Sequence, residues 1–254
     1  MSNANAISIK LLEYSKKYKV NHQMILIRFF HERLLFRVSV SEFKNHLLLK
    51  GGNLLYSIQG NTARPTVDID FSGNKISNDI EEIKKMFLQI LAIETNDGVI
   101  FNAETLNASE INEQNQYTGV RVKVIAQLAN IKQNIQIDIG FGDVITPAPQ
   151  TLHYPILLEN FEVPVVQAYT IETVIAEKLQ AIIILAQLNS RMKDFYDIYS
   201  LLKSEKINFE VVKEAITQTF NNRNTPVNFD SIVFKEEFYT DANRLKMWNA
   251  FLTK

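Results

Sequence analysis

The chain has 254 residues, of which 46% are hydrophobic and 22% are charged, and its formal net charge is −1 at pH 7. This composition is typical of a globular protein with a buried core, and it excludes a chain that attracts nucleic acid through strong overall positive charge. Cysteine is absent, which excludes disulfides and thiolate metal sites and fits a reducing, cytoplasmic location. The first ten residues lack the pattern of a signal peptide, and no apolar run is long enough to span a membrane.

The N-terminal part is predicted to be helical. Residues 5–38 carry two apolar patterns at helical spacing, and Asn21 is a suitable N-cap for the second helix. Arg28, Arg33 and Arg37 lie along this second helix. Because exposed charge is the rule on helices, we expect these arginines to form a solvated face rather than an RNA contact.

The most informative stretch runs from Leu47 to Ser72 and is predicted to form a strand, a tight turn, a short helix and a second strand. The turn is formed by Gly51 and Gly52, which leave room for a phosphate to approach backbone N–H groups. The N-terminus of the following helix favours an anion, and the Asn53 amide can add a hydrogen bond to it. This stretch is a candidate nucleotide-binding segment.

The second strand of this stretch carries two carboxylates. Residues 67–71 alternate between apolar and acidic side chains, so Asp68 and Asp70 project to the same side. Neighbouring carboxylates repel each other unless a cation joins them, and their oxygens suit Mg²⁺ or Mn²⁺. The alternative is an amphipathic edge strand with two solvated aspartates, because a short acidic motif alone gives many false matches.

A helix from Asn78 to about Ile93 and three strands are predicted downstream. The strands cover residues 101–106, 117–129 and 131–141. Asp138 lies on the polar face of the last strand, where simple alternation would also place it, and Asp143 is the competing acidic candidate.

A proline-rich segment at residues 147–164 is the predicted boundary between two domains, 1–150 and 151–254. Short strands are expected near residues 155–158 and 163–168, and helices after them.

The helix that begins after Thr170 carries Lys178 beside its apolar stripe, from where a lysine can reach a nucleotide triphosphate. In the next predicted helix Asp194 and Asp197 share one face. The alternative is that these two aspartates only form part of a solvent-exposed helix start.

Two motifs in this order resemble the AbiEii/MenT-like toxin nucleotidyltransferases, a family of the polymerase-β-type nucleotidyltransferase superfamily. The first is KGGNLL at residues 50–55 with RPTVDIDF at 64–71, in which Asn53 stands where the family usually has Ser or Thr. The second is IETVIAEKL at residues 171–179 with RMKDFYD at 191–197. The resemblance covers about residues 47–203.

The resemblance implies an α/β (α+β) fold with a small mixed sheet, flanking helices and a helical C-terminal half that completes the nucleotide site. It also implies that a third carboxylate completes the metal site and activates the attacking hydroxyl, that one lysine contacts the nucleotide phosphates, and that an aspartate supports the basic groups. The implied site therefore consists of three metal-binding residues, Asp68, Asp70 and Asp138; two further catalytic residues, Lys178 and Asp194; and the nucleotide-binding residues Gly51, Gly52, Asn53 and Lys178.

The activity implied is Mg²⁺-dependent transfer of a nucleoside monophosphate from a nucleoside triphosphate to an RNA 3′ end, especially that of tRNA. An antitoxin encoded nearby is the expected partner. Transfer to a protein or a small molecule, and a non-catalytic nucleotide-binding interaction protein, remain alternatives. A metal phosphohydrolase ranks last because the four histidines show no ligand spacing: His22, His31, His46 and His153.

Overall fold

The computed structural model describes residues 3–113, 117–227 and 230–253. The chain divides into two compact units: Met1–Gly142 with Gln150–Ala168, and Asp143–Pro149 with Tyr169–Lys254. The segment Gln150–Ala168 lies in the first unit, and its two strands join the sheet of that unit. The domain boundary predicted after residue 150 stays a prediction.

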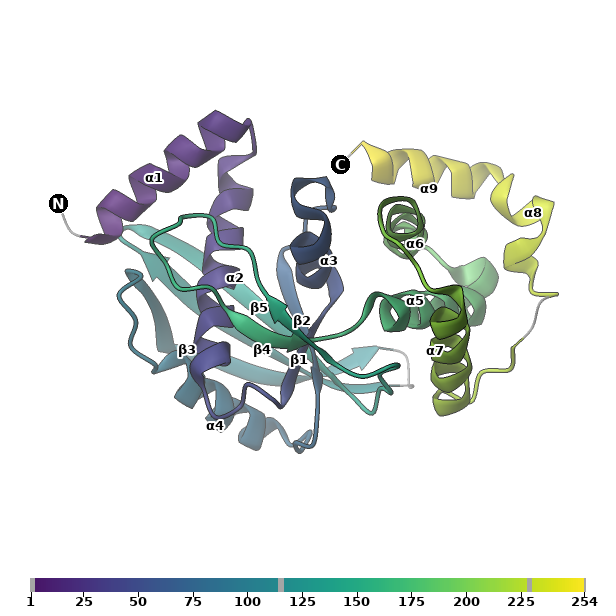
Figure 1. The fold of residues 1–254 in the computed structure, drawn as a ribbon, viewed down its shortest axis with the longest axis horizontal. Coiled ribbons are helices and arrows are strands. Elements are labelled where there is room, and N and C mark those ends of the chain that lie inside the picture. The colour runs from purple at the N-terminus through teal and green to yellow at the C-terminus, as the bar shows by residue number, and fades with distance from the viewer. Residues whose placement is uncertain (1–2, 114–116, 228–229, 254) are drawn as a thin grey trace. The chain divides into compact units, whose positions relative to one another are not determined.

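The first unit is built around a mixed sheet of seven strands in the order β3-β4-β5-β2-β1-β7-β6 (Figure 1). The pairs β2–β5 and β1–β7 are parallel, and the other neighbouring pairs are antiparallel. This architecture confirms the predicted α/β class. The strands are β1 (Leu47–Lys50), β2 (Asp68–Gly73), β3 (Val99–Glu113), β4 (Tyr117–Leu128), β5 (Ile131–Phe141), β6 (Gln150–His153) and β7 (Val165–Ala168).

One strand prediction is wrong. No strand forms at residues 155–158, and β6 instead precedes this segment at Gln150–His153. The ladder between β6 and β7 stops at the pair His153–Val165. Pro155 lacks the N–H group that a continuing ladder would need.

The register of the central strands separates an apolar face from a polar face. Ile69 on β2 pairs with Ile137 on β5, and Ile137 pairs with Val122 on β4. All three side chains are fully buried. Since side chains alternate along a strand, the residues between them point to the opposite face, which carries the acidic residues.

Among the described residues, the α-helices of the first unit are α1 (Asn3–Tyr18), α2 (His22–Val40), α3 (Gly51–Gln59) and α4 (Ile80–Leu91). Asn21 caps α2 as predicted, because its side chain accepts a hydrogen bond from the Met24 N–H. The cap of α4 is Asp79 rather than Asn78. Helices α2 and α4 contact the sheet and each other, and their buried side chains complete the core.

The solvated arginine face predicted for α2 is wrong. Arg33 and Arg37 are both buried. Arg33 forms an ion pair with Glu32 at 2.9 Å. Arg37 forms an ion pair with Asp97 at 2.7 Å. Arg37 also donates to the Val99 carbonyl at 2.9 Å. The reason is that α2 is buried on nearly all sides, so its charged groups need partners inside the protein.

The second unit is helical. Helix α5 contacts α6 and α7, and α6 contacts α9. Thr170 caps α5 by accepting a hydrogen bond from the Thr173 N–H, and Asp241 caps α9. Within the described ranges, no helix has both the length and the apolarity that a membrane crossing needs. The helices are α5 (Ile171–Leu185), α6 (Met192–Ser204), α7 (Phe209–Asn222), α8 (Glu236–Tyr239) and α9 (Ala242–Leu252).

Candidate metal and nucleotide site

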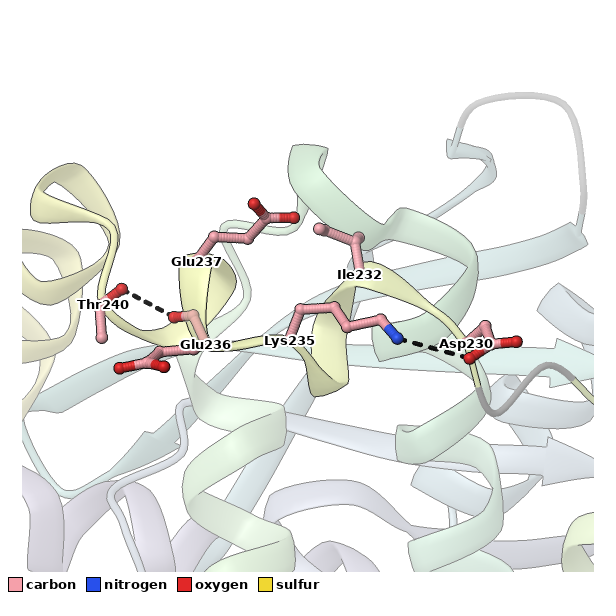
Figure 2. Close-up of a pocket in the computed structure, with 6 residues that line it drawn as sticks. All are labelled: Asp230, Ile232, Lys235, Glu236, Glu237 and Thr240. Atoms are coloured by element: carbon pink, nitrogen blue, oxygen red, sulfur yellow. Dashed lines mark hydrogen bonds and ion pairs between the residues drawn. The ribbon is translucent and has the colours of Figure 1, made fainter.

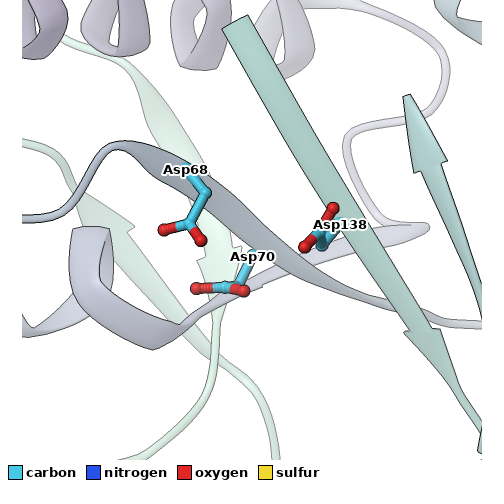
Figure 3. A group of neighbouring side chains, drawn as sticks. All are labelled: Asp68, Asp70 and Asp138. Atoms are coloured by element: carbon cyan, nitrogen blue, oxygen red, sulfur yellow. The ribbon is translucent and has the colours of Figure 1, made fainter. Parts of the chain in front are cut away.

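Three carboxylates meet on the polar face of the sheet. Asp68 and Asp70 lie on β2, and Asp138 lies on the parallel neighbour β5, directly in register with Asp70. One ligand oxygen from each of the three lies within 4.8 Å of the other two. Figure 3 shows the three side chains turned toward one another from the two strands. The alternation in β2 and β5 predicted the shared face, and the pairing of these two strands brings the carboxylates together.

Asp143, the competing candidate for the third carboxylate, belongs to the second unit. It accepts a hydrogen bond from the Arg223 guanidinium at 2.7 Å and another from the Tyr169 hydroxyl at 3.2 Å. Asp143 is therefore part of an ion-pair network of its own. The geometry favours Asp138 as the third member of the group.

The three carboxylates fit a divalent metal ion. They offer hard oxygen ligands, which Mg²⁺ and Mn²⁺ prefer over the nitrogen and sulfur ligands of zinc sites. They are half-buried, so a cation could reach them from solvent. In the described part of the chain, this is the one group of three or more such side chains close enough to share an ion.

The Gly-Gly turn lies directly against this group. Gly51 begins α3 with a φ of +66°, and a Cβ atom at this position would overlap the Asp70 carboxylate. A Cβ atom on Gly52 would overlap the Thr66 side chain. Glycine is therefore needed at both positions for space, and at Gly51 also for its backbone conformation. The first backbone N–H groups of an α-helix have no acceptor within the helix, so a phosphate could approach those at the start of α3, where Gly51 lies against Asp70.

The buried Asn53 side chain holds the backbone of Asp68. Its side chain is only 1% exposed, and its amide donates a hydrogen bond to the Asp68 carbonyl at 2.7 Å. Its Oδ1 atom accepts from the Tyr154 hydroxyl at 3.0 Å and lies 3.2 Å from His31 Nδ1. The side chain is thus part of the scaffold that holds β2. The phosphate contact predicted for the Asn53 side-chain amide stays a prediction.

Three supporting residues were missed from the sequence: Thr66, Tyr154 and His31. Thr66 donates from Oγ1 to Asp68 Oδ1 at 2.7 Å, so Asp68 is held at its carboxylate as well as at its carbonyl. Thr66 lies inside the matching RPTVDIDF motif, so a closer reading of that motif could have found it. His31 and Tyr154 carry no such signal, because they are 22 and 101 residues from Asn53.

The buried histidine predicts a pH-dependent stability. Burial lowers the pKa of His31 to about 4, although the hydrogen bond with Asn53 and the charge of Asp68 act in the opposite direction. In the unfolded chain the imidazole binds a proton near pH 6.5, so the native state loses stability as the pH falls from about 6.5 to about 4. Through His31 alone, the free energy of unfolding should be about 3 kcal/mol lower at pH 4 than at neutral pH.

Urea unfolding of the wild type and of His31→Asn between pH 7 and pH 4 tests this prediction. Glu32 complicates the wild-type curve, because burial raises its pKa to about 7, and stability therefore rises as the pH falls from 7 toward 4.5. Both proteins contain Glu32, so its effect cancels when the free energy of unfolding of one protein is subtracted from that of the other. A difference that stays constant across the pH range would show that His31 has the same pKa in the native and unfolded states, and would contradict the prediction.

The second unit holds the other predicted site residues. The Lys178 ammonium lies 2.8 Å from Asp194 Oδ1 and 2.8 Å from Asp197 Oδ2, and both carboxylates are almost completely buried. Arg191 Nε lies 2.8 Å from Asp194 Oδ2. Burial would raise the pKa of Asp194, but Lys178 and Arg191 more than offset it and hold that pKa below its usual value. The structure thus shows Lys178 as a cation fixed between two aspartates.

A separate pocket of about 660 Å³ lies around α8 and is lined by Asp230, Ile232, Lys235, Glu236, Glu237 and Thr240. Figure 2 shows Glu236 and Glu237 pointing in opposite directions. The ion pair between Lys235 and Asp230 is long, at 3.4 Å, and exposed. This pocket gathers no group of catalytic side chains.

A mixed sheet with three converging carboxylates defines the chain as an α/β protein with a candidate divalent-metal site. The chain belongs to the family described as "Nucleotidyl transferase AbiEii toxin, Type IV TA system", whose model matches residues 33–254. The curated proteins give no match.

Two solved structures match this chain. JHP933 from Helicobacter pylori has 14% sequence identity and a TM-score of 0.51, and the match covers 79% of this chain and 80% of that one. A candidate nucleotidyltransferase from H. pylori has 14% identity and a TM-score of 0.40, with 81% and 95% coverage. At this identity, the similarity to JHP933 indicates a shared fold.

Proposed function

We propose that this protein is a toxin-type nucleotidyltransferase of a bacterial toxin–antitoxin or abortive-infection system. It transfers a nucleoside monophosphate from a nucleoside triphosphate to an acceptor hydroxyl, which we take to be the 3′ end of tRNA. Membership of the AbiEii family supports the class of reaction. The observation that carries the chemistry is the convergence of Asp68, Asp70 and Asp138 on one face of the sheet.

Asp68, Asp70 and Asp138 would hold Mg²⁺, and the same ligands can take Mn²⁺. A divalent cation bound there supplies charge stabilisation to the attacking and leaving oxygens of an in-line displacement. The Gly51-Gly52 turn and the N-terminus of α3 bind phosphate oxygens through backbone N–H groups. Lys178, supported by Asp194, offsets the negative charge of the phosphates.

In the reaction, the acceptor oxygen forms a bond to the α-phosphorus as the bond from that phosphorus to the bridging oxygen of the β-phosphate breaks. Pyrophosphate leaves, and the proton of the acceptor hydroxyl passes to water. Asp138 lies on β5, the strand beside β4, at the edge of the carboxylate group. We assign to it the role of favouring deprotonation of the acceptor hydroxyl. An antitoxin encoded alongside and a cytoplasmic location, where triphosphates and tRNA are present, complete the proposal.

The proposal is tested by incubating the purified protein with total tRNA, Mg²⁺ and each of the four α-labelled nucleoside triphosphates in turn. We expect label in tRNA with at least one nucleotide, and its loss when EDTA removes the divalent ions. Mass spectrometry of the protein and small-molecule fractions identifies the acceptor if tRNA stays unlabelled. Label in either fraction would contradict the tRNA assignment and retain the reaction class.

A further inference from the structure

A single arginine holds the third carboxylate from the neighbouring strand. Arg121 on β4 is in register with Asp138 on β5. Its Nε atom donates to Asp138 Oδ1 at 2.8 Å, and its Nη2 atom donates to Asp138 Oδ2 at 2.7 Å. This two-point bond fixes both the position and the plane of the carboxylate, which a single hydrogen bond would leave free to rotate.

Gln136 completes the arrangement. Its Nε2 atom donates to Asp138 Oδ2 at 3.3 Å, so Oδ2 accepts two hydrogen bonds from the protein and Oδ1 accepts one. Each oxygen of an ionised carboxylate has about two acceptor positions. Oδ1 is therefore the oxygen that keeps an acceptor position for a cation or a hydroxyl.

Arg121 also places a positive charge beside the three carboxylates. Three carboxylates within 4.8 Å of one another repel strongly, and a guanidinium bound to one of them offsets part of this repulsion. The Arg121 side chain is 32% exposed and that of Asp138 is 17% exposed. The pair is only partly buried, so we explain it by what it does to the carboxylate.

We propose that Arg121 is a positioning residue, which orients the Asp138 carboxylate so that Oδ1 is presented to a divalent cation. Its consequence for turnover rests on the proposed nucleotidyl transfer, whereas its consequence for cation binding does not. Carboxylates that bind metals are themselves held by hydrogen bonds, and loss of such a bond typically weakens metal binding by about 10–100-fold.

Three variants separate position from charge. Arg121→Gln removes the guanidinium, and Arg121→Lys keeps the charge but loses the two-point bond. Lys123→Gln is the matched control, because Lys123 lies two residues along the same strand, on the same face, and is exposed. Circular dichroism and the melting temperature check the fold of each variant, and Arg121→Lys carries the test if Arg121→Gln does not fold.

The first measurement is Mn²⁺ binding to the nucleotide-free protein, by electron paramagnetic resonance. We expect an affinity about 10–100-fold weaker in Arg121→Gln, an intermediate loss in Arg121→Lys and no change in Lys123→Gln. The second is steady-state kinetics, in which kcat should fall by a similar factor while the KM for the triphosphate stays within about twofold. Equal or tighter Mn²⁺ binding in Arg121→Gln, or no Mn²⁺ binding by the wild type, would overturn the proposal.

The two proposals can fail separately. If the wild type transfers no nucleotide but Mn²⁺ binding falls in Arg121→Gln and not in Lys123→Gln, the positioning role stands and the proposed reaction does not. If transfer occurs and all variants bind Mn²⁺ and turn over like the wild type, the proposed reaction stands and the role of Arg121 is refuted.

Discussion

Replacement of Asp70 with asparagine should lower nucleotide transfer by about 10³-fold or more while the protein stays folded. Asp70 shares a face with Asp68 and lies in register with Asp138, so it is the central member of the carboxylate group. Asparagine keeps the shape of the side chain but removes the charge that a divalent cation needs. A loss of about 4 kcal/mol of transition-state stabilisation corresponds to this factor.

The matched control is Asp79→Asn. Asp79 is an aspartate of the same unit, but it caps α4 by accepting hydrogen bonds from the N–H groups of Glu81 and Glu82. Asparagine caps helices as well as aspartate does, so activity and stability should stay close to those of the wild type. Label incorporation and thermal melting measure both effects. An Asp70→Asn protein that retains more than a tenth of the wild-type activity would contradict the assignment of the metal site.

Gly51→Ala should have the second largest effect. Alanine there must adopt a φ of +66° and place a Cβ atom where the Asp70 carboxylate now lies. The backbone conformation alone costs about 1–2 kcal/mol, and the overlap displaces Asp70 from the carboxylate group. We expect a loss of activity of about 10²-fold or more, together with weaker Mn²⁺ binding and a lower melting temperature.

Gly60→Ala separates these two causes. Gly60 lies at the other end of α3 with a φ of +61°, and a Cβ atom there meets no atom within 4 Å. This variant therefore has the backbone strain without the overlap. It should lose stability in urea unfolding and keep most of its activity. Equal losses of activity in Gly51→Ala and Gly60→Ala would show that strain, rather than displacement of Asp70, is the cause.

The carboxylate faces could be predicted from the sequence because alternation in a strand is a local property. Asp68 and Asp70 share a face whatever lies beside them, and the same holds for the polar side of β5. The arrangement of neighbouring strands is not local. Nothing in the sequence places Arg121 opposite Asp138, since their register depends on how β4 and β5 pair. The role of Arg121 in holding the third carboxylate could therefore be identified from the structure but not from the sequence.

The buried charges of α2 were missed for a related reason. Arginine at helical spacing indicates an exposed face unless a partner is known, and the partner of Arg37 lies 60 residues away at Asp97. The predicted domain boundary after residue 150 depended on the prolines of the surrounding segment. Prolines mark irregular backbone, but they do not exclude short strands beside them that join an earlier sheet.

The most direct test of the central claim compares an α-labelled with a γ-labelled nucleoside triphosphate in otherwise identical reactions. Nucleotidyl transfer predicts that the α-label enters the acceptor and that the γ-label is released in pyrophosphate, with both signals lost in Asp70→Asn. Transfer of the γ-label to the acceptor would instead show phosphoryl transfer at the carboxylate group and would contradict the account.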